Sequence, residues 1–210
     1  MFPCLKLKKI QERLQCIEGF EKPKIKLEQY ITPWHLGSHM LYTIQSHYGD
    51  LDGKLVADLG CGCGVLSIGA AVLNASSVIG FEIDEDVLDI FQSNIQDHNL
   101  SNIDAILCDV LKISERFYKK FDTVLMNPPF GTKQNEGIDM RFLEVALKLS
   151  NKVVYSLHKS STRKHILKYT KSLGVNGEVL AELKYDLPAT YKFHKKDSVD
   201  VQVDFYRFLV

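Results

Sequence analysis

Long apolar runs are missing from this 210-residue sequence. A membrane-spanning helix needs roughly 18 or more consecutive apolar residues, and the chain contains no such run. Lysines also interrupt the N-terminal segment Met1–Lys6, which therefore lacks the continuous apolar region of a secretory signal peptide. We accordingly expect neither a membrane span nor secretion.

Paired cysteines are also missing. The chain has five cysteines, an odd number, and their spacing matches neither a disulfide framework nor a metal site. Cys61 and Cys63 stand within a glycine-rich segment, whereas the other three are scattered. We therefore predict reduced thiols, no metal, and residence in the nucleus or the cytoplasm.

An excess of positive charge is the third absence. Lys and Arg number 26, Asp and Glu also number 26, and the formal net charge is zero. This balance argues against a general nucleic-acid coat protein, so any RNA binding must be local. One basic cluster, Lys22, Lys24 and Lys26, lies near the start, and the candidate RNA-binding residues near the end are Lys192, His194, Lys195 and Lys196. Tyr191 and Phe193 interleave the second cluster and could stack on an unpaired base, although either cluster could be ordinary solvated surface.

The pattern of apolar residues predicts one α/β domain that covers residues 1–210. Unbroken apolar segments alternate with helical ones from Leu55 onward, which is typical of a parallel sheet covered on both faces. A chain with 45% apolar residues can bury one good core. No long helix separates the last two strands, so the final one is expected to insert antiparallel. The predicted strands are 55–59, 78–82, 103–107, 121–126, 153–157, 178–185 and 199–208.

The N-terminal 50 residues form an expected helical cap on this domain. Apolar spacing predicts helices at 5–16 and 33–48, with Pro33 in the first turn of the second. Gln29 and Thr32 then fall in the loop that precedes this helix, where Thr32 could simply act as its cap.

The stretch Asn127-Pro128-Pro129-Phe130 follows the predicted strand 121–126. Two prolines cannot continue the strand or begin a helix at Asn127, so the strand must end there. The Pro128 carbonyl is then fixed in place, Asn127 adds a side-chain carbonyl acceptor, and Phe130 offers a flat face. Such a set suits a planar NH2 group, as in adenine, cytosine or a glutamine amide. An ordinary strand-to-turn junction is the alternative interpretation.

A glycine-rich turn, Gly60-Cys61-Gly62-Cys63-Gly64, follows the predicted strand 55–59, which carries Asp58 near its end. Glycines between a strand and a helix allow the backbone to approach a nucleotide-like ligand closely. Glu82 ends the next strand, about 20 residues further on, where an acidic side chain can bind ribose hydroxyls. These features together predict a nucleotide-type cofactor.

These motifs resemble those of the class I S-adenosylmethionine-dependent methyltransferases, whose fold is a Rossmann-like seven-stranded sheet, mostly parallel with one antiparallel strand. Further stretches narrow the resemblance: Glu28-Gln29-Tyr30, Tyr155-Ser156-Leu157-His158-Lys159, and Tyr185-Asp186-Leu187-Pro188. Over nearly the whole chain, the sequence is similar to the methyltransferase-like protein 5 family, which methylates adenine N6 in small-subunit (18S) ribosomal RNA. One departure is Ile31, where relatives tend to have proline.

This resemblance implies S-adenosyl-L-methionine as the cofactor and places its site. Asp109 and Val110, just past the third strand, would bind the cofactor adenine, although Asp109 could instead cap the following segment. The implied cofactor-binding residues are Gln29, Thr32, Asp58, Gly60, Gly62, Cys63, Val65, Glu82, Asp109 and Val110, and the implied catalytic residues are Asn127, Pro128, Pro129 and Phe130. Residence in the nucleolus and the cytoplasm is implied as well.

The third strand should lie at an open sheet edge in this topology. Residues 102–107 carry few charges and no proline, and an unprotected edge is an aggregation hazard that proteins normally cover. We therefore expect a partner to add a strand there. The resemblance implies a tRNA methyltransferase 112-like activator subunit, which would make a heterodimer. The N-terminal helix or a loop could cover the edge instead.

Two other functions remain open from the sequence. The same fold can methylate glutamine amides in proteins, although those relatives usually have Tyr at the position of Phe130 and carry an additional N-terminal domain. A cofactor-binding protein without activity is the second alternative. We expect 155–159 and 185–196 to be surface segments, and His158 and His194 to lie on the surface or contact phosphate rather than act in acid-base catalysis.

Overall fold

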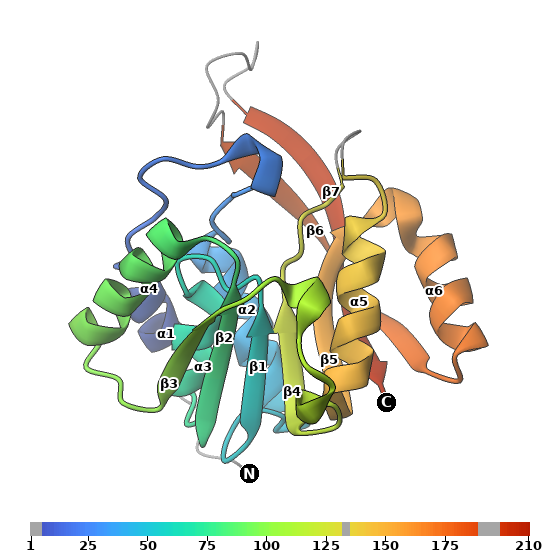
Figure 1. Cartoon of the computed structure of the whole chain (residues 1–210), viewed down its shortest axis with the longest axis horizontal. Coiled ribbons are helices and arrows are strands. Elements are labelled where there is room, and N and C mark those ends of the chain that lie inside the picture. The colour runs from blue at the N-terminus through green and yellow to red at the C-terminus, as the bar shows by residue number, and fades with distance from the viewer. Residues whose placement is uncertain (1–5, 132–134, 189–197) are drawn as a thin grey trace.

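The computed structural model describes residues 6–131, 135–188 and 198–210. Its centre is one sheet with the strand order β3-β2-β1-β4-β5-β7-β6 (Figure 1). The candidate RNA-binding residues Lys192, His194, Lys195 and Lys196 lie outside the described residues. The strands are β1 (Leu55–Leu59), β2 (Ser77–Glu82), β3 (Ile103–Leu107), β4 (Phe121–Met126), β5 (Ser150–Lys159), β6 (Asn176–Pro188) and β7 (Ser198–Leu209).

The strand directions confirm the predicted Rossmann-like sheet. β1 pairs in parallel with β2 and β4, β2 with β3, and β4 with β5. β7 is antiparallel to both β5 and β6. The predicted strand 178–185 is too short, because pairing with β7 continues from Asn176 to Pro188.

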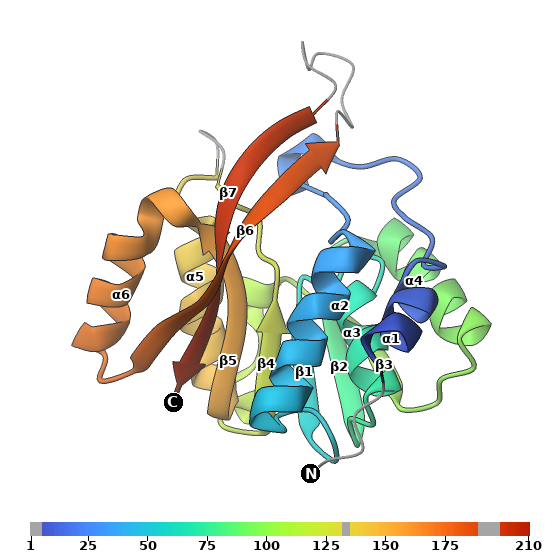
Figure 2. The same cartoon turned by 180° about the vertical axis from the view of Figure 1, so that it is seen from behind.

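Helices cover both faces of the sheet. The helices α1 (Leu7–Leu14), α2 (Trp34–Thr43), α3 (Val65–Val72) and α4 (Glu85–Asp97) lie on one face, and α5 (Ile138–Leu149) and α6 (Arg163–Ser172) on the other (Figures 1 and 2). Each face has its own apolar core, the first built around Leu41 and Phe91 and the second around Phe121 and Leu143. None of the described helices is long and apolar enough to cross a membrane.

The N-terminal segment packs on the face that α3 and α4 also cover. α1 buries Ile10 and Leu14, as its apolar spacing predicts, and contacts α2 and α3. α2 ends at Thr43 and continues as a single π-helical turn to Tyr48, so the predicted helix 33–48 changes geometry in its last turn. The chain between α1 and α2 crosses the carboxyl ends of the strands, where parallel sheets bind ligands (Figure 2).

Candidate active site

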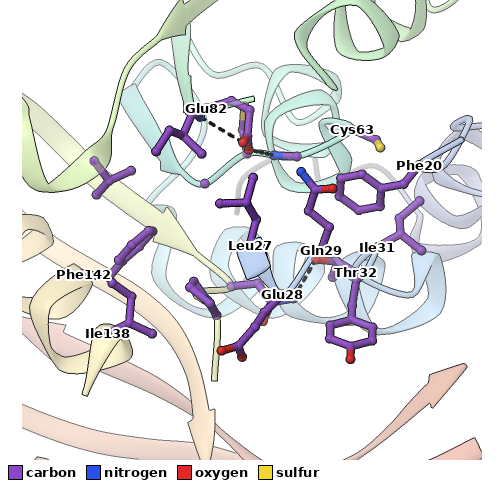
Figure 3. Close-up of a pocket in the computed structure, with 18 of the residues that line it drawn as sticks. Phe20, Leu27, Glu28, Gln29, Ile31, Thr32, Cys63, Glu82, Ile138 and Phe142 are labelled. Atoms are coloured by element: carbon purple, nitrogen blue, oxygen red, sulfur yellow. Dashed lines mark hydrogen bonds between the residues drawn. The ribbon is translucent and has the colours of Figure 1, made fainter. Parts of the chain in front are cut away.

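A cavity of about 190 Å³ lies at the carboxyl ends of β1, β2, β3 and β4. Segments far apart in sequence form its walls: residues 26–32, the glycine-rich turn, the ends of three strands, and the start of α5 (Figure 3). The predicted site residues that line it are Gln29, Thr32, Gly60, Gly62, Cys63, Val65, Glu82, Asp109, Val110, Asn127 and Pro129. The topology rule for parallel sheets therefore locates this cavity correctly.

The glycine-rich turn adopts a backbone that few other residues tolerate. Gly60, Gly62 and Gly64 have φ angles of +68°, +52° and +96°. A Cβ atom on Gly64 would also lie 2.2 Å from the Phe91 ring of α4. Positive φ and this close packing require glycine at position 64, which allows the turn to fold tightly between β1 and α3.

Glu82 connects the end of β2 to the glycine-rich turn. Its Oε2 accepts a hydrogen bond from Gly62 N at 3.0 Å, and its Oε1 accepts from Ile83 N and Asp84 N at 2.9 and 3.0 Å. Burial raises the pKa of this carboxyl, while the three N–H donors oppose the rise. A carboxylate has about four acceptor positions, so three bonds leave capacity for one ligand hydroxyl.

Asp58 lies behind the cavity rather than in its wall. Its side chain is 1% exposed, and Oδ2 accepts a hydrogen bond from Ser67 Oγ of α3 at 2.6 Å. Burial raises the pKa of Asp58 to about 7, a rise that Ser67 opposes and Glu82 reinforces. Asp58 was predicted to bind the cofactor, but in the structure it joins β1 to α3 beneath the glycine-rich turn.

Gln29 and Thr32 belong to the segment that crosses the cavity. Gln29 Nε2 donates to Asp84 Oδ2 at 2.7 Å, and its Oε1 accepts from Lys24 N at the same distance, so the side chain ties this segment to the start of α4. Thr32 does not cap α2, because the cap residue is Pro33 and no side chain bonds there. The capping alternative for Thr32 is therefore wrong.

Asp109 and Val110 close the cavity beyond β3. Asp109 Oδ1 accepts from Leu111 N at 3.0 Å, so this side chain does cap the short helix Val110–Lys112. Val110 is buried and offers an apolar surface to a flat ring. The predicted capping role and a place in the cavity wall thus occur together, since the other carboxylate oxygen is not used by the cap.

The cysteines of the turn do not provide a nucleophile. Cys63 lines the cavity and is 2% exposed. Burial raises the pKa of its thiol to about 12, and burial also raises the pKa of Cys61. Both side chains therefore stay protonated near neutral pH and serve as apolar wall.

Asn127 stands at the end of β4 with both amide hydrogens engaged. Its Nδ2 donates to Thr32 Oγ1 at 2.9 Å and to Tyr185 Oη at 3.1 Å. Its Oδ1 is buried and has no hydrogen-bond partner in the described part of the chain. A buried acceptor without a partner typically costs about 1–3 kcal/mol, which makes this oxygen a strong candidate for a ligand's N–H group.

Pro128, Pro129 and Phe130 continue from Asn127. Pro129 lines the cavity, Pro128 is buried, and Phe130 is half-buried with its ring 5.7 Å from the ring of Tyr185 in an edge-to-face arrangement. Lys159 Nζ donates to the Gly131 carbonyl at 3.3 Å, which fixes the segment from the side of β5. The strand therefore ends at Asn127, as two prolines require.

Two segments predicted to be surface are partly core. Tyr155 and Tyr185 are 0% and 1% exposed. His158 is fully buried and its Nδ1 lies 3.1 Å from Asp139 Oδ2, so it neither lies on the surface nor contacts phosphate. Alternation along β5 buries side chains on both faces of the sheet, which the polar neighbours of these residues conceal in the sequence.

The sequence prediction missed Tyr185 as a site residue. Burial raises the pKa of this phenol to about 12, and hydrogen bonds with Asn127 and Thr32 oppose the rise. Its hydroxyl also donates to the Ile31 carbonyl at 3.2 Å. The motif Tyr185–Pro188 is visible in the sequence, but nothing local shows that it meets residues more than 50 positions away.

The donor set fits a class I methyltransferase. A glycine-rich turn, a carboxylate with spare acceptor capacity and an apolar slot suit an adenosine cofactor, and the unpartnered Asn127 Oδ1 suits an amino group as acceptor. The methyltransferase small domain family matches residues 36–152.

Relatives named for their reaction align with almost the entire chain. The rRNA N(6)-adenosine-methyltransferase METTL5 of Danio rerio is 60% identical over 97% of this chain and 99% of its own length. The Mettl5 protein of Drosophila melanogaster is 55% identical over 97% and 96%. The chain belongs to this family, and the predicted methyltransferase class is confirmed.

A solved structure agrees with the fold at similar coverage. A protein from Pyrococcus horikoshii, provisionally described as an RNA methyltransferase, superposes with a TM-score of 0.82 at 36% identity, over 98% of this chain and 96% of that one. The whole sheet, including the reversed strand β7, is therefore the family's fold.

Proposed function

We propose that this protein transfers a methyl group from S-adenosyl-L-methionine to N6 of a specific unpaired adenosine in small-subunit ribosomal RNA. The observation that carries the proposal is the state of Asn127, whose amide hydrogens are both engaged and whose buried Oδ1 has no partner among the described residues. The names of the METTL5 relatives support rRNA and adenine N6 as the target. The choice of the small subunit rests on the family resemblance.

The cofactor would occupy the part of the cavity formed by β1, β2 and β3. Backbone of the glycine-rich turn would approach it, Glu82 would accept ribose hydroxyl hydrogens, and Asp109 with Val110 would hold the adenine. Gln29 fixes the segment that crosses the cavity and so would exclude water. When bound, S-adenosylmethionine supplies a methyl group activated by its sulfonium.

Asn127 would make the target nitrogen a better nucleophile. The N6 lone pair of adenine is delocalised into the ring, and accepting hydrogen bonds from the amine hydrogens favours a pyramidal nitrogen whose lone pair can form the new C–N bond. Asn127 Oδ1 would accept one hydrogen and the Pro128 carbonyl the other. The nitrogen then loses a proton to solvent, so no side chain has to act as a strong base.

Phe130 would hold the target base. Adenine N6 cannot be reached inside a helix, so the base must be unpaired or flipped at a cost of a few kcal/mol. Stacking on an aromatic ring typically returns about 1–3 kcal/mol per base. The half-buried ring of Phe130, edge-on to Tyr185, is held in one orientation that suits this role. The basic cluster at residues 192–196 would contact RNA phosphates.

We further propose that a small activator subunit of the tRNA methyltransferase 112 type adds a strand to β3. β3 ends the sheet, and Leu107 and nearby Ile83 are 52% and 50% exposed. The opposite edge, β6, has the defences that protein edges usually carry: a bulge between Val179 and Ala181 and the charged pairs Glu178–Arg207 and Glu182–Arg163. α1 packs on α2 and α3, so it does not serve as the cover of β3.

A substitution at the edge tests the partner. Leu107→Asp should reduce co-purification of the activator subunit at least ten-fold, because it places a charge in the apolar interface. Leu173→Asp is the matched control, since Leu173 is also 52% exposed but follows α6 on the other side of the molecule. Equal retention of the partner by both variants would exclude this edge.

Methyl transfer from radiolabelled S-adenosylmethionine tests the reaction itself. Total small-subunit RNA and total protein would be offered together in the presence of the activator subunit, and the RNA would be digested to nucleosides. Label in N6-methyladenosine supports the proposal. Label in protein would instead support glutamine methylation, and cofactor binding without any label would indicate a protein without activity.

A further inference from the structure

Tyr185 contacts three separate parts of the site from the end of β6. Its hydroxyl accepts a hydrogen bond from Asn127 Nδ2 at 3.1 Å and donates to the Ile31 carbonyl at 3.2 Å. Its ring contacts Phe130 edge-on at 5.7 Å. The side chain is 1% exposed, so these contacts replace water completely.

The single proton of the phenol decides which way the Asn127 amide faces. A neutral tyrosine donates one hydrogen bond, and here that hydrogen goes to the Ile31 carbonyl. Tyr185 can therefore only accept from Asn127, so the NH2 end of the amide must face it. Because Thr32 Oγ1 receives the second amide hydrogen at 2.9 Å, Oδ1 is left over as an acceptor.

The opposite orientation of the amide would defeat the reaction. If the Ile31 carbonyl did not take the phenol's proton, Tyr185 could donate to Asn127 Oδ1, and the amide would turn by 180°. An NH2 group would then face the amino group of the target base, and two donors repel each other. Burial keeps the phenol protonated, since its pKa is raised to about 12, so it has one proton to direct at neutral pH.

We propose that Tyr185 is a positioning residue that sets the orientation of the Asn127 amide and couples it to the segment 29–32. The inference deepens the proposed function and rests on it. The acceptor geometry is complete only when this segment lies across the cavity, because the segment supplies both Thr32 Oγ1 and the Ile31 carbonyl. Tyr185 acts through Asn127 and is assigned no contact with either reactant.

The variant Tyr185→Phe tests this role, because it keeps the ring on Phe130 and removes only the hydroxyl. We expect kcat for transfer to RNA to fall about 10- to 100-fold, as for loss of a preorganised polar group, while the cofactor Kd changes less than about 3-fold. Tyr206→Phe is the matched control. Tyr206 is also fully buried, and its hydroxyl donates to Asp204 rather than to the site.

The outcomes separate positioning from stability. The inference holds if Tyr185→Phe loses kcat and Tyr206→Phe does not, at similar shifts in Tm. It is overturned if Tyr185→Phe keeps kcat within about 2-fold of the wild type, or if both variants lose kcat in proportion to their Tm. A wild-type protein that forms no N6-methyladenosine would overturn the proposed function instead, so the two failures are distinguishable.

Discussion

The two halves of the cavity differ in how completely their polar groups are satisfied. In the cofactor half, Glu82 accepts three backbone hydrogen bonds and Asp58 accepts one from Ser67. In the acceptor half, Asn127 gives away both amide hydrogens and keeps a buried oxygen without a partner in the described chain. The first half is a finished scaffold, whereas the second is complete only when a substrate donor arrives.

This difference has a structural origin. The cofactor half is built mostly from consecutive residues around β1 and β2, which pair in register, so its geometry follows from the sheet itself. The acceptor half joins Thr32, Asn127 and Tyr185 from three distant segments. Damage to the cofactor half should therefore affect binding or folding, and damage to the acceptor half should affect turnover.

Gly64→Ala is expected to have the largest effect on the cofactor half. A φ of +96° already costs an L-residue about 1–2 kcal/mol, and the new Cβ would lie 2.2 Å from Phe91. We expect cofactor affinity to fall more than about 100-fold together with a lower Tm, measured by calorimetric titration and thermal melting. Gly53→Ala is the control, because Gly53 has φ +69° but nothing within 4 Å of a Cβ. Equal losses in both variants would show that strain alone, not the packing at Phe91, matters.

Phe130→Ala tests the acceptor half next. Loss of a stacking ring should cost about 1–3 kcal/mol in binding of the target base, which is about 5- to 150-fold in kcat/KM for RNA. Cofactor affinity should remain near the wild-type value, because Phe130 is not part of the cavity wall. Phe130→Tyr should retain most activity. A fall in cofactor affinity that matches the fall in kcat/KM would contradict the separation of the two halves.

Thr32→Val should have a smaller effect on turnover. The variant has nearly the same shape but removes the acceptor of one Asn127 amide hydrogen, so a loss of about 10-fold in kcat is expected, in line with one hydrogen bond. Thr32→Ser keeps the hydroxyl and should stay within about 3-fold of the wild type. The two variants would be compared in single-turnover assays at saturating cofactor, and equal activities would remove Thr32 from the acceptor half.

Asp58 provides a pH test of the scaffold, with the smallest effect. Its pKa in the folded protein is about 7, against an ordinary 3.8, so between these values the folded state binds more protons than the unfolded state. The free energy of unfolding therefore falls as pH rises through this window. Asp58→Asn cannot ionise and should lose less Tm between pH 5 and pH 8 than the wild type, by a few degrees. An identical pH dependence of Tm in both proteins would refute the burial of an ionisable Asp58.

Sequence reasoning predicted the sheet, its reversed strand and most of the cavity wall. Those features depend on local patterns, such as the glycines after β1 and the two prolines after β4, and on the rule that parallel strands end at one edge. The same reasoning gave Asp58 a direct role at the cofactor, because a motif does not show whether a strand's side chain points at the ligand or beneath the turn. It also treated His158 as exposed.

Tyr185 shows most clearly what a sequence pattern cannot supply. The residue lies on the long hairpin of β6 and β7, and its position depends on a register that includes a bulge at Val179 and Ala181. A one-residue shift in pairing moves every later side chain to the other face of a sheet. Only the assembled structure therefore brings its hydroxyl to Asn127 and Ile31.

Asn127→Ala gives the most direct test of the account. The variant removes the acceptor oxygen but leaves the cofactor half intact, so we predict a cofactor Kd within about 3-fold of the wild type and a loss of at least about 10³-fold in the single-turnover rate of N6-methyladenosine formation. Both values would be measured on the same preparations, with the activator subunit present. Methyl transfer by Asn127→Ala within 10-fold of the wild-type rate would contradict the central claim that this amide prepares the target nitrogen.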